Sequence, residues 1–393
     1  MSGTLSRVSD LETAYVMEVL RTQFRNRAAG TMVYRLEQKF ASTFGAKYAI
    51  AQVNGTTTLH TALVAAGIEP GDEVIVPPLT MMSTCFAVLH AGAIPVFADV
   101  HPQTYTIDPE KIKSCITERT KAMITVSLYG LPPDMDPIME IAGQNRLHVI
   151  EDNAQCFLGY YKGKVAGSIG HLASYSFQIS KHLTSGEGGM LITSDEGMAE
   201  KARRFGTLGY ASIGAASKKG KVTKEVIQDP NYERHISVGW NYRMSEPAAA
   251  IALAQTERIL ELVAMRANVA AMYADAHAGC RWLIPQLVLA GCQHAWWTYA
   301  LKLESGGKIG WHEFRKKYME LGGDGIYAAW KLNYLEPVLR GKTLRRQPFE
   351  IGLCPVSESL QPNLLQFKTN YLDLEVAKLK AEALAKTIRF FGA

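Results

Sequence analysis

Residues that could bind an anion stand between a predicted strand and a predicted helix near the start of the chain. They form the segment Asn54-Gly55-Thr56-Thr57-Thr58. Hydroxyls and backbone N–H groups at the start of a helix attract anions such as a phosphate, and the glycine permits a tight turn. The same residue types also suit an ordinary helix cap, so this segment alone leaves both interpretations open.

A second segment, Glu151-Asp152-Asn153-Ala154-Gln155, follows a short apolar run that reads as a strand. Ligands of open α/β sheets bind beyond the carboxyl ends of the strands, which is where this segment lies. An aspartate there can keep a ring nitrogen protonated, and Gln155 can exchange a hydrogen bond with the same ligand. Asp152 could equally cap the following turn, and the spacing does not decide between the two interpretations.

The third segment brings a lysine close to a glycine-rich turn. A predicted strand ends near Ser176, Lys181 follows in the loop, and the turn Gly186-Glu187-Gly188-Gly189 comes next. Lys181 and His182 are the only charged or imidazole side chains between residues 172 and 186. Burial lowers the pKa of a lysine amine, as a Schiff-base lysine requires, although most lysines lie at a protein surface.

The elements that position these segments alternate between strands and helices. Strands are predicted at residues 48–53, 73–76, 94–98, 122–128, 147–151, 173–177 and 190–193, and helices at 57–67, 84–91, 109–116 and 135–145. Such alternation predicts an α/β fold whose mostly parallel sheet is sandwiched by helices. All three segments then lie along the same edge of the sheet.

The second half of the chain has a different pattern. Residues 210–234 are polar and predict a long loop, whereas residues 246–276 predict one long helix that links two domains. Strand and helix patterns after residue 297 predict a smaller α+β domain. We therefore expect an N-terminal segment, residues 1–34, that packs on the small domain, a large ligand-binding domain at 35–250, and the linking helix with the small C-terminal domain at 251–393.

Composition excludes several classes of protein. A formal net charge of +5 over 393 residues is too small to indicate a nucleic-acid-binding surface. The six cysteines have no metal-binding or disulfide spacing, and the histidines form no metal motif, so we expect no metal ion and free thiols in the cytoplasm. The first 21 residues lack the apolar core of a signal peptide. We expect neither membrane nor nucleic acid as a partner.

The three segments suit one cofactor when they are taken together. Pyridoxal 5′-phosphate needs an anchor for its phosphate, a carboxylate for its pyridine nitrogen and an amine that forms a Schiff base with its aldehyde. The chain offers these groups in Thr56 and its neighbours, in Asp152 and in Lys181.

The order of these segments resembles the DegT/DnrJ/EryC1/StrS aminotransferases, the sugar-aminotransferase branch of the fold-type I pyridoxal phosphate enzymes. The matching stretches are NGTTTLHTAL, GDEVIVPPLT, EDNAQCFLGYYKGKVAGSIG, SYSFQISKHLTSGEGGM and GWNYRMSEPAAAIALAQ. The resemblance implies an α/β fold like that of aspartate aminotransferase, with residues 35–250 as the domain that binds the cofactor.

The resemblance also implies roles for the residues that would hold the cofactor ring. Lys181 would be the catalytic residue and form the Schiff base, Asp152 would pair with the pyridine nitrogen, and Gln155 would contact the ring hydroxyl. Where relatives usually have an aromatic residue stacked on the ring, this chain has Met81. A thioether can pack against an aromatic face, so we expect weaker stacking with binding retained.

The cofactor phosphate would have two sources of ligands according to the same resemblance. Thr56, Thr57 and Ser176 would bind it from one chain. The partner subunit's Asn241 would reach it from the other chain, which implies a homodimer with shared active sites.

The implied activity is transfer of an amino group from an amino acid, expected to be L-glutamate, to a keto group of a sugar. We expect a nucleotide-linked sugar of saccharide, antibiotic or surface-glycan biosynthesis, with a keto-inositol or a small phosphorylated ketone as alternatives. Residues that could contact the substrate are Trp296, Trp297, Tyr327, Trp330 and Lys331. Two other functions compete, a sugar dehydratase, whose family members carry histidine at the position of Lys181, and a non-catalytic cofactor-binding regulator.

Overall fold

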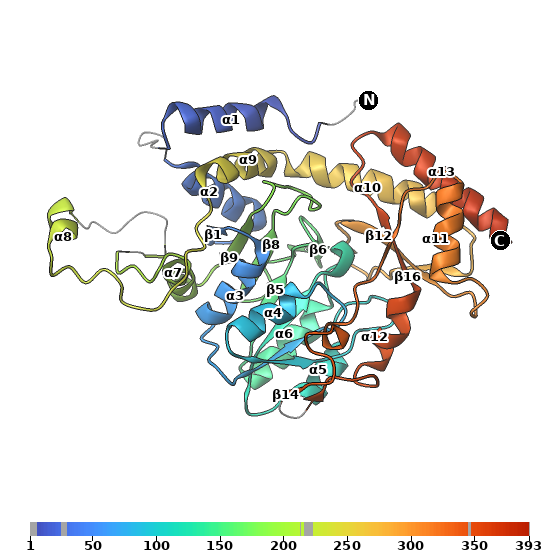
Figure 1. The fold of residues 1–393 in the computed structure, drawn as a ribbon, viewed down its shortest axis with the longest axis horizontal. Helices are drawn as coiled ribbons and strands as arrows, with labels where there is room; N and C mark the ends of the chain where they lie inside the picture. Colours follow the sequence, from blue (N-terminus) through green and yellow to red (C-terminus); the bar gives the residue numbers. More distant parts are fainter. Residues whose placement is uncertain (1–5, 25–29, 213, 216–222, 345–346, 393) are drawn as a thin grey trace.

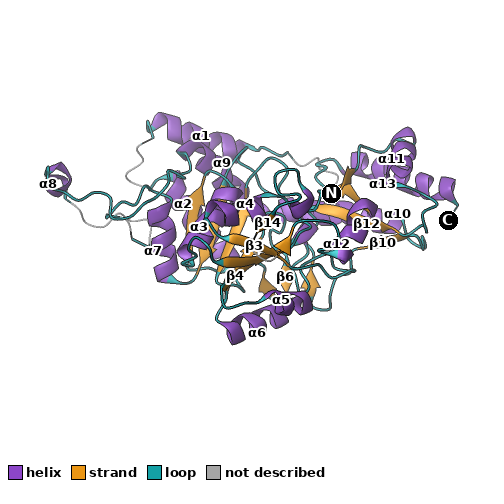
Figure 2. Ribbon diagram, turned by 60° about the horizontal axis from the view of Figure 1, so that its bottom comes forward, coloured by secondary structure: helices purple, strands orange, loops and turns teal. Residues whose placement is uncertain are grey.

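The computed structural model describes residues 6–24, 30–212, 214–215, 223–344 and 347–392. A large α/β domain is joined to a smaller C-terminal domain by two consecutive helices (Figure 1). The strands of the large domain form a central layer with helices on both sides (Figure 2). The expected fold class is therefore confirmed.

The large domain is built on a seven-stranded sheet with the strand order β1-β9-β8-β5-β4-β2-β3. The strands are β1 (Tyr48–Gln52), β2 (Glu73–Val76), β3 (Ile94–Phe97), β4 (Thr120–Val126), β5 (His148–Asp152), β8 (Leu172–Ser176) and β9 (Gly189–Thr193). Strands β8, β5, β4, β2 and β3 are parallel to one another, and β9 is antiparallel to both β8 and β1. The sequence predicted each of these strands to within two residues at either end.

Helices bury both faces of this sheet. They are α2 (Met32–Phe44), α3 (Gly55–Ala65), α4 (Ser83–His90), α5 (Pro109–Cys115), α6 (Met135–Asn145) and α7 (Glu196–Phe205). Strand β2 shows how the faces are divided, because successive side chains of a strand point to opposite sides. Val74 and Val76 join the apolar cluster that includes Leu59 of α3, whereas Ile75 joins the cluster that includes Ile138 of α6.

The N-terminal segment lies against the large domain. Helix α1 (Asp10–Arg21), which the sequence did not predict, runs along α9 (Glu246–Glu257) at the top of Figure 1. Val19 and Met32 share an apolar cluster with Tyr175 and Met190 of the central sheet. The described part of residues 1–34 therefore buries its apolar side chains against the large domain and α9.

The linking element is two helices, not the single helix that residues 246–276 predicted. Helix α9 ends at Glu257 and α10 (Ile259–Ala276) begins after Arg258, whose φ of −101° and ψ of 7° depart from helical geometry. Leu253 of α9 belongs to the large-domain cluster, and Tyr273 of α10 belongs to the small-domain cluster. Ile259 and Leu262 of α10 still belong to the large-domain cluster, so the helical segment reaches the small domain only in the later turns of α10.

The small domain packs helices on one antiparallel sheet of order β10-β12-β16-β13. Its main elements are β10 (Leu283–Pro285), β12 (Thr298–Leu303), α11 (Trp311–Glu320), β13 (Tyr327–Ala328), β16 (Leu364–Lys368) and α13 (Leu374–Phe391). Leu301 of β12, Phe314 of α11 and Leu384 of α13 lie in its apolar core.

Short elements complete the described chain. They are β6 (Tyr160–Tyr161), β7 (Lys164–Val165), α8 (Lys224–Gln228), β11 (Cys292–Gln293), β14 (Thr343–Leu344), β15 (Gln347–Pro348) and α12 (Pro355–Leu360), with three single 3₁₀ turns at Leu128–Gly130, Asn333–Leu335 and Gln361–Asn363. Of the long loop predicted at 210–234, residue 213 and residues 216–222 lie outside the described residues. Helix α8, at the far left of Figure 1, interrupts the described remainder of that loop.

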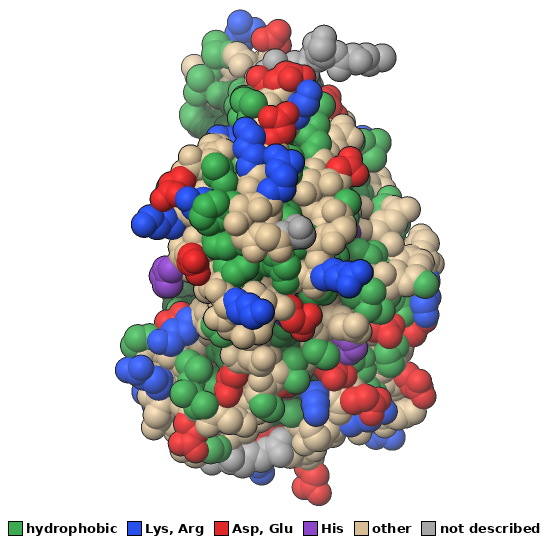
Figure 3. Space-filling model, turned by 90° about the vertical axis from the view of Figure 1, so that its right-hand side faces the viewer, with side chains coloured by type: hydrophobic (Ala, Val, Ile, Leu, Met, Phe, Trp, Pro, Cys, Tyr) green, Lys and Arg blue, Asp and Glu red, His purple; other side chains and the backbone are tan. Residues whose placement is uncertain are grey.

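The surface carries charges of both signs. On the face formed by the small domain, basic and acidic side chains are interspersed among apolar ones (Figure 3). This distribution agrees with the small net charge of +5. Among the helices that the structure describes, none is long and apolar enough to cross a membrane.

A buried ion pair ties α7 to α2. Arg203 Nη1 lies 2.9 Å from Glu37 Oε1, and Arg203 also donates to the carbonyl of Ala49. The Arg203→Met variant leaves the Glu37 carboxylate buried without a cation, so we expect its free energy of unfolding in urea to fall by about 3–5 kcal/mol. Lys113→Met, which breaks the exposed pair with Glu110, is the control and should leave the urea midpoint unchanged. Equal midpoints for Arg203→Met and the wild type would contradict this expectation.

Candidate active site

A cavity of about 690 Å³ opens at the carboxyl edge of the parallel strands. Its floor comes from the ends of β5 and β8 and from the start of α3, and its roof comes from β13 and β16 of the small domain. Of the residues predicted to form the site, those that line the cavity are Thr56, Met81, Asp152, Gln155, Ser176 and Lys181. The structure therefore brings together six side chains that are up to 125 positions apart in the sequence.

One end of the cavity has the chemistry of an anion site. Asn54 caps α3 by accepting from Thr57 N, and its carbonyl accepts from Thr58 N, so the N–H groups of Gly55 and Thr56 are the ones that the cap does not use. A side chain at Gly55 would lie 2.9 Å from Ser176 Cβ, so only glycine lets the end of β8 approach the helix. Thr56 Oγ1 donates to Ser83 Oγ at 3.0 Å beside this position. Hydroxyls and backbone donors thus converge where a phosphate group would be bound.

Thr57 does not join the other predicted phosphate ligands. Its hydroxyl donates to the carbonyl of Asn54 at 2.8 Å, within the first turn of α3. Thr57 is also absent from the residues that line the cavity. In this segment Asn54 and Thr57 form the helix cap, and Thr56 is the threonine that lines the cavity.

Asp152 is buried at the end of β5, with 6% of its surface exposed. Its Oδ2 accepts from Thr84 Oγ1 at 2.9 Å, and its Oδ1 accepts from Ala154 N at 3.2 Å. Burial raises the pKa of this carboxyl, while both hydrogen bonds and the positive charge of Lys181 act in the opposite direction. The carboxylate is therefore fixed in orientation on the cavity floor.

Gln155 is oriented by a strained backbone. Its Oε1 accepts from Tyr129 N at 2.8 Å, which leaves the side-chain NH₂ as the group available to a ligand. Tyr129 has a φ of +64°, an uncommon value for a residue with a side chain. The neighbouring Gly130 has no room for a Cβ, which would lie 2.7 Å from Trp296 N.

Lys181 faces the cavity from the loop that follows β8. Its Nζ lies 4.5 Å from the centroid of the Trp297 ring. Burial and the charge of Arg266 lower the pKa of the amine, Asp152 raises it, and the net effect is a value of about 8. His182 is directed elsewhere, because its Nε2 lies 2.7 Å from the carbonyl oxygen of Ala295 in the protein interior.

The remaining predicted residues divide between the cavity and the surface. Met81 is half-exposed and lines the cavity, as expected for a side chain beside a flat ligand. Asn241 lies in an exposed segment and forms a bridge with Thr207, away from the cavity-lining residues of its own chain.

Three of the five residues that could contact the substrate line the cavity. Trp297, Tyr327 and Trp330 line the cavity, and the Trp297 and Trp330 rings stack with centroids 5.8 Å apart. Trp296 and Lys331 do not line it. Trp296 instead stacks on His294, with ring centroids 3.9 Å apart.

Two residues that the sequence did not predict support the site through hydrogen bonds. Thr84 holds Asp152, and Arg266 of α10 donates to the carbonyl groups of Ser180 and Lys181. An arginine inside the otherwise apolar stretch LVAMRANVAAM was the signal that could have identified Arg266.

The residues of the cavity fit pyridoxal phosphate. The Thr80 hydroxyl is buried at the cavity and has no hydrogen-bond partner among the described residues, so it is free for a ligand. A hydroxyl-lined helix start can hold the phosphate, Asp152 offers a carboxylate to a ring nitrogen, and Lys181 offers an amine to an aldehyde. With a sheet of this topology, these features define a fold-type I pyridoxal phosphate enzyme.

The chain belongs to the DegT/DnrJ/EryC1/StrS aminotransferase family, whose sequence model matches residues 7–370. A GDP-perosamine synthase of Caulobacter vibrioides is 41% identical over 309 residues, which are 78% of each chain. A UDP-2-acetamido-2-deoxy-3-oxo-D-glucuronate aminotransferase of Pseudomonas aeruginosa is 39% identical over 269 residues, 68% of this chain and 69% of that relative.

The fold agrees with a solved aminotransferase from Psychrobacter cryohalolentis. The two share 31% identity and a TM-score of 0.86, and the match covers 100% of this chain and 99% of the other. The protein is an aminotransferase that uses pyridoxal phosphate, and the expected family, enzyme class and cofactor are confirmed.

Proposed function

We propose that this aminotransferase moves an amino group from L-glutamate to a keto group of a nucleotide-linked sugar. The observation that carries the proposal is the cavity, which places the Lys181 amine and the Asp152 carboxylate under an aromatic wall of Trp297, Tyr327 and Trp330. Aromatic rings offer apolar faces to the C–H surface of a sugar and to a nucleotide base. The names of two similar proteins, a GDP-sugar and a UDP-sugar enzyme, support the same substrate class.

The proposed mechanism assigns separate tasks to the residues on the cavity floor. Pyridoxal phosphate, when bound, stabilises the negative charge left when a proton leaves the carbon next to the amino group. Thr56 and Ser176 would bind the phosphate, Gln155 would orient the ring through its NH₂ group, and Met81 would pack beside the ring. Asp152 would keep a proton on the ring nitrogen. Thr84, through its hydrogen bond to Asp152, positions that carboxylate.

Lys181 has two tasks in this mechanism. Its Nζ would attach the cofactor, and as a free amine it would accept a proton from the donor carbon as general base and give it back as general acid. An amine whose pKa is about 8 has a substantial neutral fraction near neutral pH, unlike an ordinary lysine. The neutral amine can both attack the aldehyde and accept the proton.

We also propose a cytoplasmic homodimer as the active form. Asn241 lies outside the cavity of its own chain, while Ile236, Val238 and Trp240 of the same segment expose apolar side chains. A second chain that covers this segment would bury those side chains and carry Asn241 into the neighbouring site. The cytoplasm suits the six cysteines, all of which are free thiols.

Replacement of Lys181 tests the proposed chemistry. For Lys181→Ala we expect kcat for amino transfer from L-glutamate to a nucleotide-linked keto-sugar to fall by about 10²–10⁴-fold, because the proton acceptor is gone. Formation of the amino sugar is followed by mass spectrometry, with Lys113→Ala at the surface as the control. A Lys181→Ala enzyme with more than a tenth of wild-type kcat would contradict the assignment. A wild type that removes a sugar hydroxyl without amino transfer would favour the dehydratase.

Subunit mixing tests the shared active site. Lys181→Ala and Asn241→Asp, which sets a carboxylate against the phosphate, should each be nearly inactive alone. In mixed dimers one of the two sites carries both changes and the other carries none. Equal co-expression should therefore restore about a quarter of wild-type activity, since about half of the dimers are mixed. Activity no higher than that of the separate variants would place Asn241 at its own chain's site, and full activity of Asn241→Asp would remove it from the site.

A further inference from the structure

Two guanidinium groups donate hydrogen bonds to the backbone of the loop that carries Lys181. Arg266 Nη2 donates to the carbonyl oxygens of Ser180 and Lys181, at 2.8 and 2.9 Å. Arg7 Nη2 donates to the same Lys181 oxygen at 2.7 Å and to that of Ile179 at 3.2 Å. The two arginines are 259 positions apart in the sequence, so the lysine loop is held between the N-terminal segment and α10.

Arg266 is a buried cation with neutral partners. Only 3% of its surface is exposed, and its other terminal nitrogen donates to the Trp297 carbonyl at 2.8 Å and to Thr369 Oγ1 at 3.2 Å. Among the described residues, no carboxylate lies within ion-pair distance of it. A buried charge without a counter-ion is costly and its field is weakly screened. Its positive potential therefore extends to the neighbouring Lys181.

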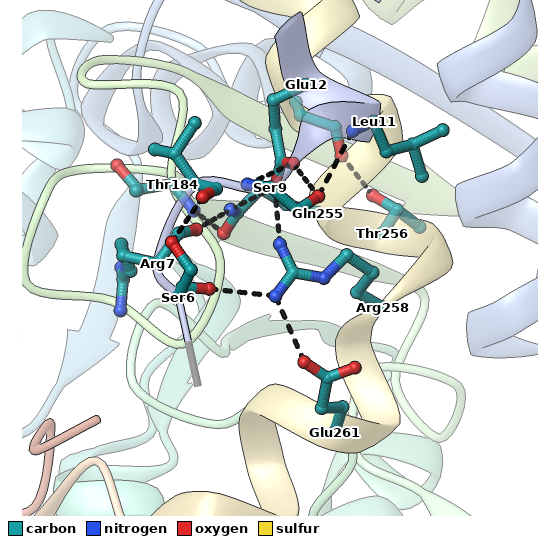
Figure 4. Close-up of polar contacts among 12 residues, drawn as sticks. Ser6, Arg7, Ser9, Leu11, Glu12, Thr184, Gln255, Thr256, Arg258 and Glu261 are labelled. Atoms are coloured by element: carbon teal, nitrogen blue, oxygen red, sulfur yellow. Dashed lines mark hydrogen bonds and ion pairs between the residues drawn. The ribbon is translucent and has the colours of Figure 1, made fainter. Parts of the chain in front are cut away.

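Arg7 belongs to the segment of residues 6–12, called the N-terminal strap below, and this strap is anchored to Gln255 and Arg258. Gln255 Nε2 donates to the Arg7 carbonyl at 2.6 Å and to Glu12 Oε1 at 2.6 Å, and Arg258 donates to the Ser6 carbonyl at 2.8 Å (Figure 4). Glu12, which is buried, pairs with Arg258 at 2.9 Å. Gln255 Oε1 also accepts from Thr184 N, so the strap and the lysine loop share one anchor on α9.

We propose that Arg7 and Arg266 are paired positioning residues for Lys181, which fix the carbonyl groups of its loop and disfavour a second positive charge on its amine. The inference rests on the proposed function of Lys181 as the amine that attaches the cofactor. It gives the N-terminal strap a part in the active site, because the strap supplies one of the two cations.

The charged groups around Lys181 include some that raise the pKa of its amine and some that lower it. Asp152 of β5 raises the pKa of the amine, whereas burial and Arg266 of α10 lower it. The charge of Arg7 in turn lowers the pKa of Arg266, as expected for two cations side by side. His182 on the same loop has a pKa well below its ordinary value and is uncharged. Glu187 and Lys368, of opposite charge, also line the cavity.

The test measures the pKa of the free Lys181 amine directly. Full-length protein is loaded with pyridoxamine phosphate, which forms no bond to Lys181, and is compared with the cofactor-free protein. Acetic anhydride then labels the amine at a series of pH values, and mass spectrometry follows the Lys181 peptide. We expect Arg7→Met, whose charge acts on Arg266, to raise the pKa slightly, and Arg266→Met, whose charge acts on the amine itself, to raise it from about 8 by about 1 pH unit. More of the amine is then protonated at pH 7.5, so labelling of Arg266→Met there should slow about five- to tenfold.

Matched variants separate charge from structure. Arg7→Lys and Arg266→Lys keep the cation and should retain a pKa near that of the wild type. Arg258→Met removes a cation that is already paired with Glu12 and Glu261 and that does not bind the lysine loop, so it should raise the Lys181 pKa by less than Arg7→Met does. Circular dichroism and thermal melting identify variants that do not fold. If Arg266→Met is one of them, Arg7→Gln, which keeps a hydrogen-bond donor without charge, should still raise the pKa.

Two results would overturn the proposal. One is a Lys181 pKa that is unchanged in folded Arg7→Met and Arg7→Gln. The other is an equal shift in Arg7→Met and Arg258→Met, which would make the effect one of loosened structure. Failure of the proposed function is distinguishable from both, because it would show as a cofactor that does not attach to Lys181 whatever the pKa of its amine.

Discussion

The amine of Lys181 and the carboxylate of Asp152 are withdrawn from bulk water into one cavity, and the surrounding structure keeps them there. Charges are costly to bury, so each group needs fixed partners. Asp152 has Thr84 and Ala154 N, while the backbone of the lysine loop has Arg266 and Arg7. The parallel sheet brings the ends of β5 and β8 together, which is why groups distant in the sequence meet at its carboxyl edge.

The small domain supplies the aromatic residues that cover the cavity. Strands alone would leave the floor of the site open to water, and the roof of Trp297, Tyr327 and Trp330 comes from beyond α10. Trp297 also contacts Lys181 through its ring, and its indole N–H donates to the Ser180 carbonyl at 3.1 Å. The same residue therefore closes the cavity and supports the loop of the attaching lysine. Helix α10 itself packs on both domains, with Leu262 in the large-domain cluster and Tyr273 in the small-domain cluster.

Much of this architecture follows from local sequence patterns. Alternating apolar strands and amphipathic helices predicted the central sheet, and the position of Asp152, Ser176 and Lys181 after predicted strands placed them at one edge. The contacts of α1 and the partners of Lys181 were not predictable in this way, because they join residues far apart in the chain. Arg7 meets Lys181 across 174 positions, and nothing in the sequence near either residue records that contact. The left-handed φ of Tyr129, which orients Gln155, is also set by tertiary packing.

The central claim is that Lys181 holds pyridoxal phosphate and releases it to an amino donor. The most direct measurement is the visible absorbance of the purified, cofactor-loaded protein before and after addition of L-glutamate, with Lys181→Ala alongside. We predict a yellow band in the wild type that bleaches when L-glutamate is added, and no such band from the cofactor alone in the variant. A wild type that binds the cofactor without a yellow band, or a Lys181→Ala protein with the same band and the same bleaching, would contradict the claim.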